Sequence, residues 1–244
     1  MCFYSANSKR ALSLAKRYGL KTDIVEMAKE IIEEQKYRIN AFKHPACPIV
    51  TNGESMEVAR WGLIPHWTRT IEEAQKIRKM TLNARAETVF SLSSFRASIH
   101  SKRCIFPVTG YFEFHHTGKT TIPYYIFLKD EEIFSIGGIY ERWQNPVSKE
   151  MMQTFTIITV PANELCKQIH NGGKNPFRMP LIISKNDERH WLDQSLKITD
   201  IQQFFTPFEA NLMDAYPIGK DFLKKQPDDA SIIDLADCYM LHHK

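Results

Sequence analysis

Cys2 is the first residue with distinctive chemistry, because removal of Met1 would give it a free α-amine and a thiol on adjacent carbons. An α-amine titrates at about pH 7.7–8.0 and a thiol at about 8.5, so a useful fraction of each is nucleophilic near neutral pH. The amine can condense with an aldehyde to an imine, and the thiol can then close on the same carbon to form a stable thiazolidine. The alternative is that Cys2 is a small core residue beside Phe3 and Tyr4.

Two further residues are suited to proton transfer. Glu113 lies between Phe112 and Phe114 in an aromatic run, and apolar neighbours raise the pKa of a carboxyl group toward neutrality. The alternative is that strand alternation turns Glu113 toward solvent. His170 stands at the junction of a short helix and an Asn-Gly-Gly-Lys-Asn-Pro loop, where an imidazole can act as an acid or base at neutral pH. A lone histidine is more often structural.

The segment LNARAETV, 82–89, places polar side chains at alternate positions. Asn83, Arg85 and Glu87 therefore share one face of an extended strand, which is either exposed to solvent or turned toward a site. An asparagine amide both donates and accepts hydrogen bonds, and an arginine fork matches the geometry of a phosphate.

The segment WGLIPHW, 61–67, leaves a strand and enters a loop that continues to Arg69. Exposed aromatic rings beside arginines suit base stacking and phosphate contact. We expect Trp61, on the strand, to be a core residue. For Trp67, in the loop, core packing and base stacking are about equally favoured.

Composition indicates a folded intracellular protein. The chain has 244 residues, 43% hydrophobic and 25% charged, without a signal peptide or a membrane-spanning apolar run, so we expect it in the cytoplasm. A net charge of +4 permits nucleic-acid binding without establishing it. The five cysteines are widely spaced, which argues against a disulfide framework or zinc site, and no cluster of metal ligands is present. We expect neither a metal nor a cofactor.

The periodicity predicts an α+β protein of one domain, with a mainly antiparallel curled sheet or β-barrel-like core and flanking helices. The tail past Asp200 shows no clear pattern. The expected elements are helices over 8–18, 23–34, 89–98 and 161–169, strands over 48–51, 56–61, 104–114, 124–128, 133–140, 154–160 and 181–184, and a helix capped by Ser184 or Asn186 that carries His190 and Trp191.

Five motifs occur together in an order that resembles the SRAP (SOS response-associated peptidase) family. They are Cys2, WGLIPHW, NARAET, GYFEF and IHNGGKNPFRMPLII, and they span about positions 2–183. The resemblance implies a single SRAP domain over 1–244, in which 194–244 is an extension that does not align.

The resemblance also implies a function and a set of site residues. Members of the family bind single-stranded DNA at abasic sites and crosslink to it through a thiazolidine at the processed cysteine. The implied catalytic residues are Cys2, Asn83, Glu113 and His170, and the implied or expected DNA-binding residues are Arg85, Trp67, Arg60, Arg69, Arg178 and Phe114. We expect a monomer whose partner is single-stranded DNA with abasic sites and not a membrane.

The sequence departs from the family pattern at three places. Phe3 and Tyr4 stand where Gly-Arg is usual, so one expected DNA-contacting arginine is absent. Phe114 replaces a usual tryptophan, and the segment between His170 and Arg178 is longer than usual.

Three activities remain open beside or instead of crosslinking. The imine stage is competent for β-elimination, which would give some lyase activity on abasic sites. Cys2 with Glu113 and His170 could form a peptidase that removes Met1 from its own chain. A non-enzymatic module that binds single strands through arginines and tryptophans is the third reading.

Overall fold

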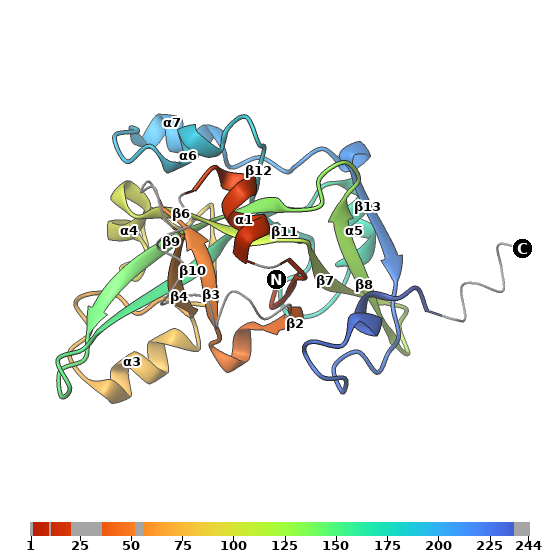
Figure 1. Cartoon of the computed structure of the whole chain (residues 1–244), viewed down its shortest axis with the longest axis horizontal. Helices are drawn as coiled ribbons and strands as arrows, with labels where there is room; N and C mark the ends of the chain where they lie inside the picture. Colours follow the sequence, from red (N-terminus) through yellow and green to blue (C-terminus); the bar gives the residue numbers. More distant parts are fainter. Residues whose placement is uncertain (1, 10, 21–35, 52–55, 237–244) are drawn as a thin grey trace, which may run out of the picture.

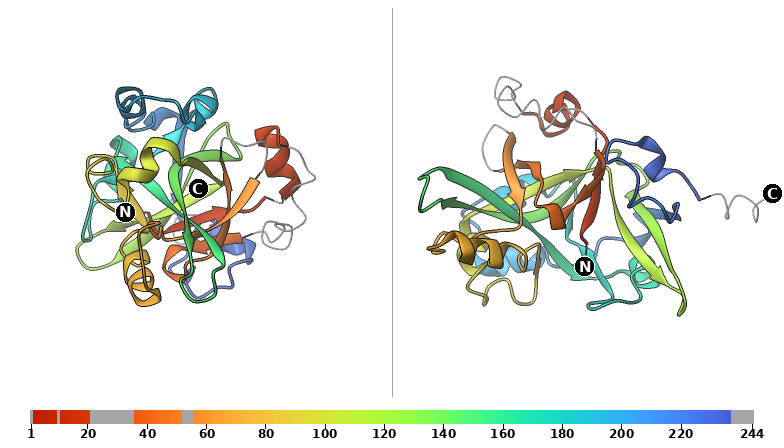
Figure 2. Two further views of the ribbon diagram at one scale, coloured as in Figure 1. Left: turned by 90° about the vertical axis from the view of Figure 1, so that its left-hand side faces the viewer. Right: turned by 90° about the horizontal axis from the view of Figure 1, so that it is seen from below.

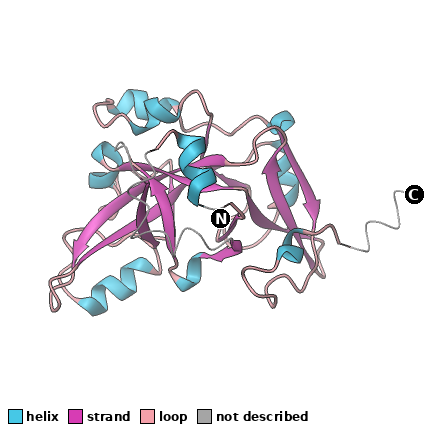
Figure 3. Cartoon of the chain, viewed as in Figure 1, coloured by secondary structure: helices cyan, strands magenta, loops and turns pink. Residues whose placement is uncertain are grey.

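The computed structural model describes residues 2–9, 11–20, 36–51 and 56–236. Its strands form two sheets, and its helices lie around the outside of them (Figures 1 and 3). The prediction of an α+β fold with a curled, barrel-like core is confirmed. The predicted helix over 23–34 and the connection between the strands predicted over 48–51 and 56–61 lie outside the described residues.

The larger sheet closes on itself into a five-stranded barrel. The last strand of the ring pairs with the first in parallel, and the other neighbours are antiparallel. Three short strands extend the sheet: β5 (Asn83–Arg85) and β11 (Arg178–Pro180) pair with the last strand of the ring, and β12 (Ile182–Ile183) pairs with β9. In order around the ring, the strands are β4 (Met56–Trp61), β3 (Ala46–Val50), β6 (Arg103–Val108), β9 (Phe134–Gln144) and β10 (Met151–Pro161).

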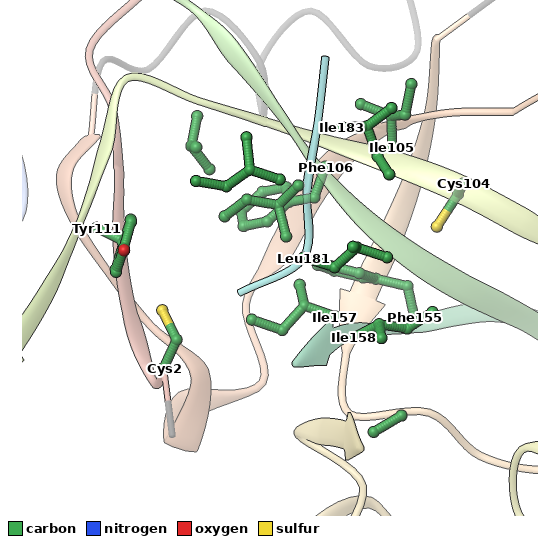
Figure 4. Close-up of a cluster of buried hydrophobic side chains, with 14 of the residues drawn as sticks. Cys2, Cys104, Ile105, Phe106, Tyr111, Phe155, Ile157, Ile158, Leu181 and Ile183 are labelled. Carbon is green, nitrogen blue, oxygen red and sulfur yellow. The ribbon is translucent and has the colours of Figure 1, made fainter. Parts of the chain in front are cut away.

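Large apolar side chains fill the barrel. Trp61, Phe106 and Phe155 are fully buried, with ring centroids 5.2–5.6 Å apart. Figure 4 shows Phe106 and Phe155 within a cluster of isoleucines and leucines from several strands. The expectation that Trp61 is a core residue is therefore confirmed. Side chains of this size each bury a large apolar area and hold the strands that carry the site in register.

The second sheet is antiparallel. Its strands, in spatial order, are β13 (Met213–Pro217), β8 (Thr121–Leu128), β7 (Gly110–His116), β1 (Tyr4–Asn7) and β2 (Lys36–Asn40). The single strand predicted over 104–114 is two strands, because the chain leaves the barrel after β6 and enters this sheet as β7. Gly110 permits the crossing, since a Cβ atom there would lie 2.3 Å from the ring of Tyr125.

The helices are short and peripheral. Figures 1 and 2 show α6 and α7 together on one side of the molecule and α3 on the opposite side. None of the described helices is long and apolar enough to cross a membrane. The helices are α1 (Ala11–Tyr18), α3 (Ile71–Arg78), α4 (Arg96–Ser101), α5 (Glu164–Ile169), α6 (Glu188–Leu192) and α7 (Ile198–Gln203), with 3₁₀ turns η2 (Ala41–Lys43), η3 (Ala210–Leu212) and η4 (Ala230–Ile233).

The predicted helix over 89–98 is wrong. Turns occupy 86–95, and α4 begins only at Arg96. Serines disfavour a helix here because their side chains bond to nearby backbone: the Ser91 hydroxyl donates to the carbonyl of Thr88 at 3.0 Å.

The expected helix starts also shift. The helix expected from Pro161 begins at Glu164, where the side chain of Asn163 accepts a hydrogen bond from the N–H of Cys166. The helix expected from residue 8 begins at Ala11 as α1, and the hydroxyl of Ser8 donates a hydrogen bond to the hydroxyl of Thr109. Ser184 and Asn186 do not cap α6, which starts after Asp187.

Arg103 fixes the C-terminal ends of two helices onto the barrel. Its fully buried guanidinium donates to the carbonyls of Ile99 and His100 at 2.8 Å, and also to the carbonyls of Trp191 and Asp193. The positive charge also complements the negative ends of the dipoles of α4 and α6.

We expect Arg103→Met to lower the free energy of unfolding by about 3 kcal/mol, since buried carbonyls lose charge-assisted hydrogen bonds. Urea unfolding measures the change. Arg142→Met is the matched control: the Arg142 side chain is 59% exposed and pairs with Glu57 at 3.2 Å, and removal of such a pair costs less than about 1 kcal/mol. Equal losses in the two variants would contradict the anchoring role.

Candidate functional site

Glu113 and His170 come together in a cleft between β7 and the end of α5. The imidazole Nε2 lies 3.8 Å from the carboxyl Oε2, and the two residues are only 6% and 4% exposed for His170 and Glu113 respectively. The cleft has a volume of about 250 Å³. Its walls are aromatic rings and a loop: Phe3, Tyr4, Phe112, Glu113, Phe114, His116, His170, Gly172, Gly173, Lys174 and Asn175.

The backbone of Arg178 sets the orientation of His170. The imidazole Nδ1 lies 2.9 Å from the Arg178 carbonyl oxygen and 3.2 Å from the Arg178 nitrogen. With Nδ1 held by the strand that follows the loop, Nε2 faces Glu113. The ring can therefore exchange a proton at Nε2 without rotating.

Burial moves the two pKa values in opposite directions. It raises the pKa of Glu113 from 4.5 to about 7, because a carboxylate loses its hydration in the cleft. It lowers the pKa of His170 from 6.5 to about 4, because desolvation disfavours the imidazolium. At neutral pH the site thus holds a neutral imidazole beside a carboxyl group near its midpoint, which is a pairing suited to acid–base catalysis. The prediction that apolar neighbours raise the pKa of Glu113 agrees with this environment.

Cys2 is buried next to this pair and is 1% exposed. Its thiol lies 3.5 Å from the carbonyl oxygen of Tyr4. Burial raises the thiol pKa well above its usual value, and the negative charge of Glu113 raises it further. Figure 4 shows the Cys2 side chain close to that of Tyr111, whose hydroxyl is 3.1 Å from the thiol of Cys166. Cys2 therefore packs as a core residue and is also electrostatically coupled to the acid of the cleft.

Asn83 lies on β5 and is 9% exposed. Within the described residues, neither the oxygen nor the nitrogen of its amide has a hydrogen-bond partner, and no hydrogen bond joins it to Cys2, Glu113 or His170. A buried amide without partners costs free energy, and a ligand that hydrogen-bonds to this amide would remove that cost.

The expected DNA-binding residues fall into two groups. The first group is exposed and consists of Arg60, Arg69, Arg85 and Trp67. The indole N–H of Trp67 donates a hydrogen bond to the Ser93 carbonyl at 3.3 Å, which orients the ring. This exposure favours base stacking over core packing for Trp67. Arg85 also donates to the side chain of Asn175, which joins it to the loop of the cleft.

Arg178 and Phe114 form internal contacts instead. The guanidinium of Arg178 pairs with Glu87 and donates to the Thr159 carbonyl at 2.6 Å, so it holds β11 against β10. The ring of Phe114 lies 6.2 Å from that of Tyr4 and is half-buried. The Arg178 guanidinium is therefore already paired within the protein, whereas Phe114 also forms part of the wall of the cleft.

Asn171 and Gly172, in the loop after His170, shape the cleft through contacts with β7 that the sequence alone did not predict. The Asn171 side chain accepts from the N–H of His116 at 2.7 Å and donates to its carbonyl at 3.0 Å, which pins the loop to β7. A Cβ on Gly172 would lie 2.5 Å from the His116 ring, so this position needs glycine. The Asn-Gly-Gly sequence indicates a tight loop, whereas its partner His116 lies 55 residues earlier in the chain and has no local signal that marks the contact.

The fold and site together define an α+β protein with a closed barrel, a second sheet and a buried Glu–His pair beside the residue that follows Met1. A family model described as SOS response associated peptidase (SRAP) matches residues 1–224. The chain belongs to this family, which confirms the resemblance inferred from its motifs.

Several curated proteins are similar to this chain. Abasic site processing protein YoqW of Bacillus subtilis is 37% identical over 175 residues, which are 70% of this chain and 73% of that protein. Abasic site processing protein YoaM of B. subtilis is 34% identical over 190 residues, 76% of this chain and 79% of that protein. Abasic site processing protein HMCES of Gallus gallus is 31% identical over 55% of this chain and 44% of that protein.

Solved structures share the fold. A protein from Bacteroides thetaiotaomicron is 47% identical, with a TM-score of 0.92 over 96% of this chain and 100% of that chain. A protein from Bordetella bronchiseptica, 22% identical, has a TM-score of 0.75 over 89% of this chain and 100% of that chain, and shows the fold alone.

Proposed function

We propose that this protein processes abasic sites in single-stranded DNA by forming a thiazolidine crosslink through Cys2 after Met1 is removed. The observation that carries the proposal is the buried pair of Glu113 and His170, which lie 3.8 Å apart. The charge of Glu113 also raises the pKa of the Cys2 thiol, so Cys2 lies within electrostatic range of this pair. The names of the relatives, which are abasic site processing proteins, support the choice of substrate. The reaction needs one chain, no metal and no cofactor.

The first step opens the sugar. An abasic deoxyribose is mostly a closed hemiacetal and must expose its aldehyde before an amine can attack. His170 is neutral, since its pKa is about 4, and Nε2 accepts the proton of the C1′ hydroxyl. The protonated form of Glu113, whose pKa is about 7, delivers a proton to the ring oxygen. Asn83 orients the sugar oxygen or the new N-terminus with its amide, which has no partner among the described residues.

The second step forms the imine and closes the ring. The Cys2 amine attacks C1′ while the protonated His170 returns its proton to the carbonyl oxygen, which becomes a hydroxyl. The Glu113 carboxylate takes a proton from the nitrogen and passes it to this hydroxyl, which leaves as water. The thiol then adds to the carbon of the protonated imine, and the thiol proton goes to the Glu113 carboxylate, which restores its acid form. A high thiol pKa fits this order, because the sulfur keeps its proton until the imine can accept the sulfur.

A denaturing gel tests the proposal. Mature protein, its N-terminus verified by intact mass, is incubated with a single strand that contains one abasic site, and separately with the same strand carrying a normal base. We expect a band of protein plus strand only with the abasic strand. Equal non-covalent binding to both strands without such a band would support a simple binding module and overturn the proposal.

The same site could also have lyase and peptidase activity, and each can be measured separately. In the reaction with the abasic strand, shorter DNA products would reveal lyase cleavage from the imine stage. The family description favours a peptidase, and purified unprocessed protein that loses Met1 on incubation alone would show that the chain processes itself. Unchanged intact mass would leave Met1 removal to a cellular aminopeptidase.

A further inference from the structure

His116 is a second imidazole in the wall of the cleft, and the crosslinking steps do not use it. It is the last residue of β7. Among the described residues, β1 pairs with β7 only along Gly110–Phe112, so β1 does not cover the edge of β7 beyond Phe112. There the Asn171 side chain bonds to both the N–H and the carbonyl of His116. The loop that follows His170 therefore holds the backbone of His116 at the cleft.

Two glycines of the same loop leave room for the His116 ring. A Cβ on Gly172 would lie 2.5 Å from the Cγ and Cδ2 atoms of the ring, so the ring packs directly against this backbone. A Cβ on Gly173 would lie 3.9 Å from Nε2. The ring is half-buried, and within the described part of the chain neither of its nitrogens has a hydrogen-bond partner. Packing thus positions the ring, and its nitrogens are available to a molecule in the cleft.

His116 lies near the catalytic pair without belonging to it. The pKa of His170 is lowered mainly by burial and further by the positive charge of His116, so the two imidazoles lie within electrostatic range. Glu113 and His170 face each other at 3.8 Å and act on the atoms at C1′ of the sugar. Tyr4 and Lys174 also line the cleft, but a phenol and an ammonium keep their protons near neutral pH, whereas an imidazole is a base there. Of the residues that line the cleft, His116 is thus the remaining one suited to take a proton from a second carbon of the sugar.

We propose that His116 is the base that removes a proton from C2′ of the Cys2 imine, and that it thereby directs this intermediate to strand cleavage in competition with thiazolidine closure. The inference rests on the proposed function, which supplies the imine. The protonated imine nitrogen draws electrons from C1′ and makes the protons on C2′ acidic. An imidazole nitrogen of His116 takes one of them. The electron pair of the C2′–H bond forms a C1′=C2′ double bond, and the electrons of the former C=N bond return to the nitrogen.

The enamine that results expels the DNA on the 3′ side of the sugar. The nitrogen lone pair restores the C=N bond, and the double bond moves to C2′=C3′. The C3′–O bond breaks, and its electron pair leaves with the phosphate oxygen. Water then hydrolyses the conjugated imine, which frees the Cys2 amine and leaves an unsaturated aldehyde on the other fragment. The imidazolium of His116 gives its proton to solvent, so the sequence is balanced without an oxidant or a reductant.

A Cys2→Ser background isolates this step, because a hydroxyl closes the ring poorly and the imine persists. Borohydride trapping on a denaturing gel measures the imine, and shorter products of an end-labelled abasic strand measure cleavage, corrected for cleavage of the strand alone. The readout is the cleavage rate per trapped imine, so a change in imine formation does not affect it. We expect His116→Ala to lower this rate by about 10²-fold, as for the loss of a general base. Free imidazole should restore cleavage, because the space beside Gly172 admits it.

Two variants separate the basic nitrogen from the packing of the ring. His116→Phe keeps an aromatic ring against Gly172 but has no basic nitrogen. It should cleave as slowly as His116→Ala, and imidazole should not rescue it because the space is filled. His115→Ala is the matched control and should keep the rate of the Cys2→Ser parent. The Nδ1 atom of His115 lies 2.7 Å from the Gln168 carbonyl oxygen, and His115 does not line the cleft.

The outcomes distinguish this inference from the proposed function. Parental cleavage per imine in His116→Phe, or no response of His116→Ala to imidazole, would overturn the role of His116 alone. A trapped imine that gives no cleavage in the parent would do the same. If borohydride traps no imine at all, the proposed function itself fails, and the role of His116 fails with it.

Discussion

Replacing Cys2 by alanine should eliminate the adduct that survives denaturation. Cys2→Ala keeps the α-amine and can still form an imine with the opened sugar. It has no sulfur to close the ring, so the imine hydrolyses when the protein is denatured. A denaturing gel with the abasic strand measures the loss, which we expect to be complete at the detection limit.

Two further variants test whether the adduct is lost because the thiol next to the amine is missing. Cys2→Ser preserves size and amine but offers a weak nucleophile, so it should give a gel band only when borohydride reduces the imine. Cys166→Ala removes a second buried thiol, which contacts Tyr111 at 3.1 Å, and should retain the adduct because its sulfur is not adjacent to the amine. Circular dichroism checks that each variant is folded, since both positions are buried.

A stable adduct in Cys2→Ala would contradict the thiazolidine and point to another nucleophile, such as a lysine. Loss of the adduct in Cys166→Ala with an intact fold would instead place the second thiol in the reaction.

Local sequence patterns predicted the strands of the barrel better than they predicted which strands pair with one another. The alternation in 154–160 indicated a strand, yet nothing in that segment shows that Thr154 pairs in parallel with Arg60 while it also pairs with Glu141. The tail past Asp200 showed no pattern because β13 is specified by pairing with β8, about 90 residues earlier. Propensity describes a segment, and pairing depends on what lies beside it.

The same distinction applies to the site. Glu113 and His170 could be chosen from their neighbours in sequence, because aromatic flanks and a loop junction are local signals. The role of Arg178 could not, since it depends on Glu87, which lies 91 residues away. The alternation in 82–89 indicated an extended segment, and Asn83 lies on the short strand β5. The lack of partners for its amide among the described residues is visible only once the surrounding side chains are in place.

Glu113→Gln should slow adduct formation by about 10²–10⁴-fold, because the amide can neither deliver nor accept the protons of ring opening and water loss. Since the pKa of Glu113 is raised to about 7, the acid form that starts the reaction is lost as pH rises through 7. The wild-type rate should therefore decline above pH 7, and the variant should lack this decline. Single-turnover crosslinking from pH 5 to 9 measures both effects.

The same titration makes an independent stability prediction. A carboxyl whose pKa rises from 4.5 to about 7 on folding stabilises the protein below pH 4.5 and loses that contribution as pH rises through 7. At pH 8 Glu113→Gln should thus have a higher free energy of unfolding than the wild type, although it forms the adduct far more slowly. Glu132→Gln changes an acid whose side chain is 73% exposed and which does not line the cleft, so it is the matched control and should keep the wild-type pH profile. A buried carboxyl group that lowers stability at neutral pH is expected where catalysis needs it. If Glu113→Gln forms the adduct at the wild-type rate, or shows the same decline in rate above pH 7, Glu113 has no part in the mechanism.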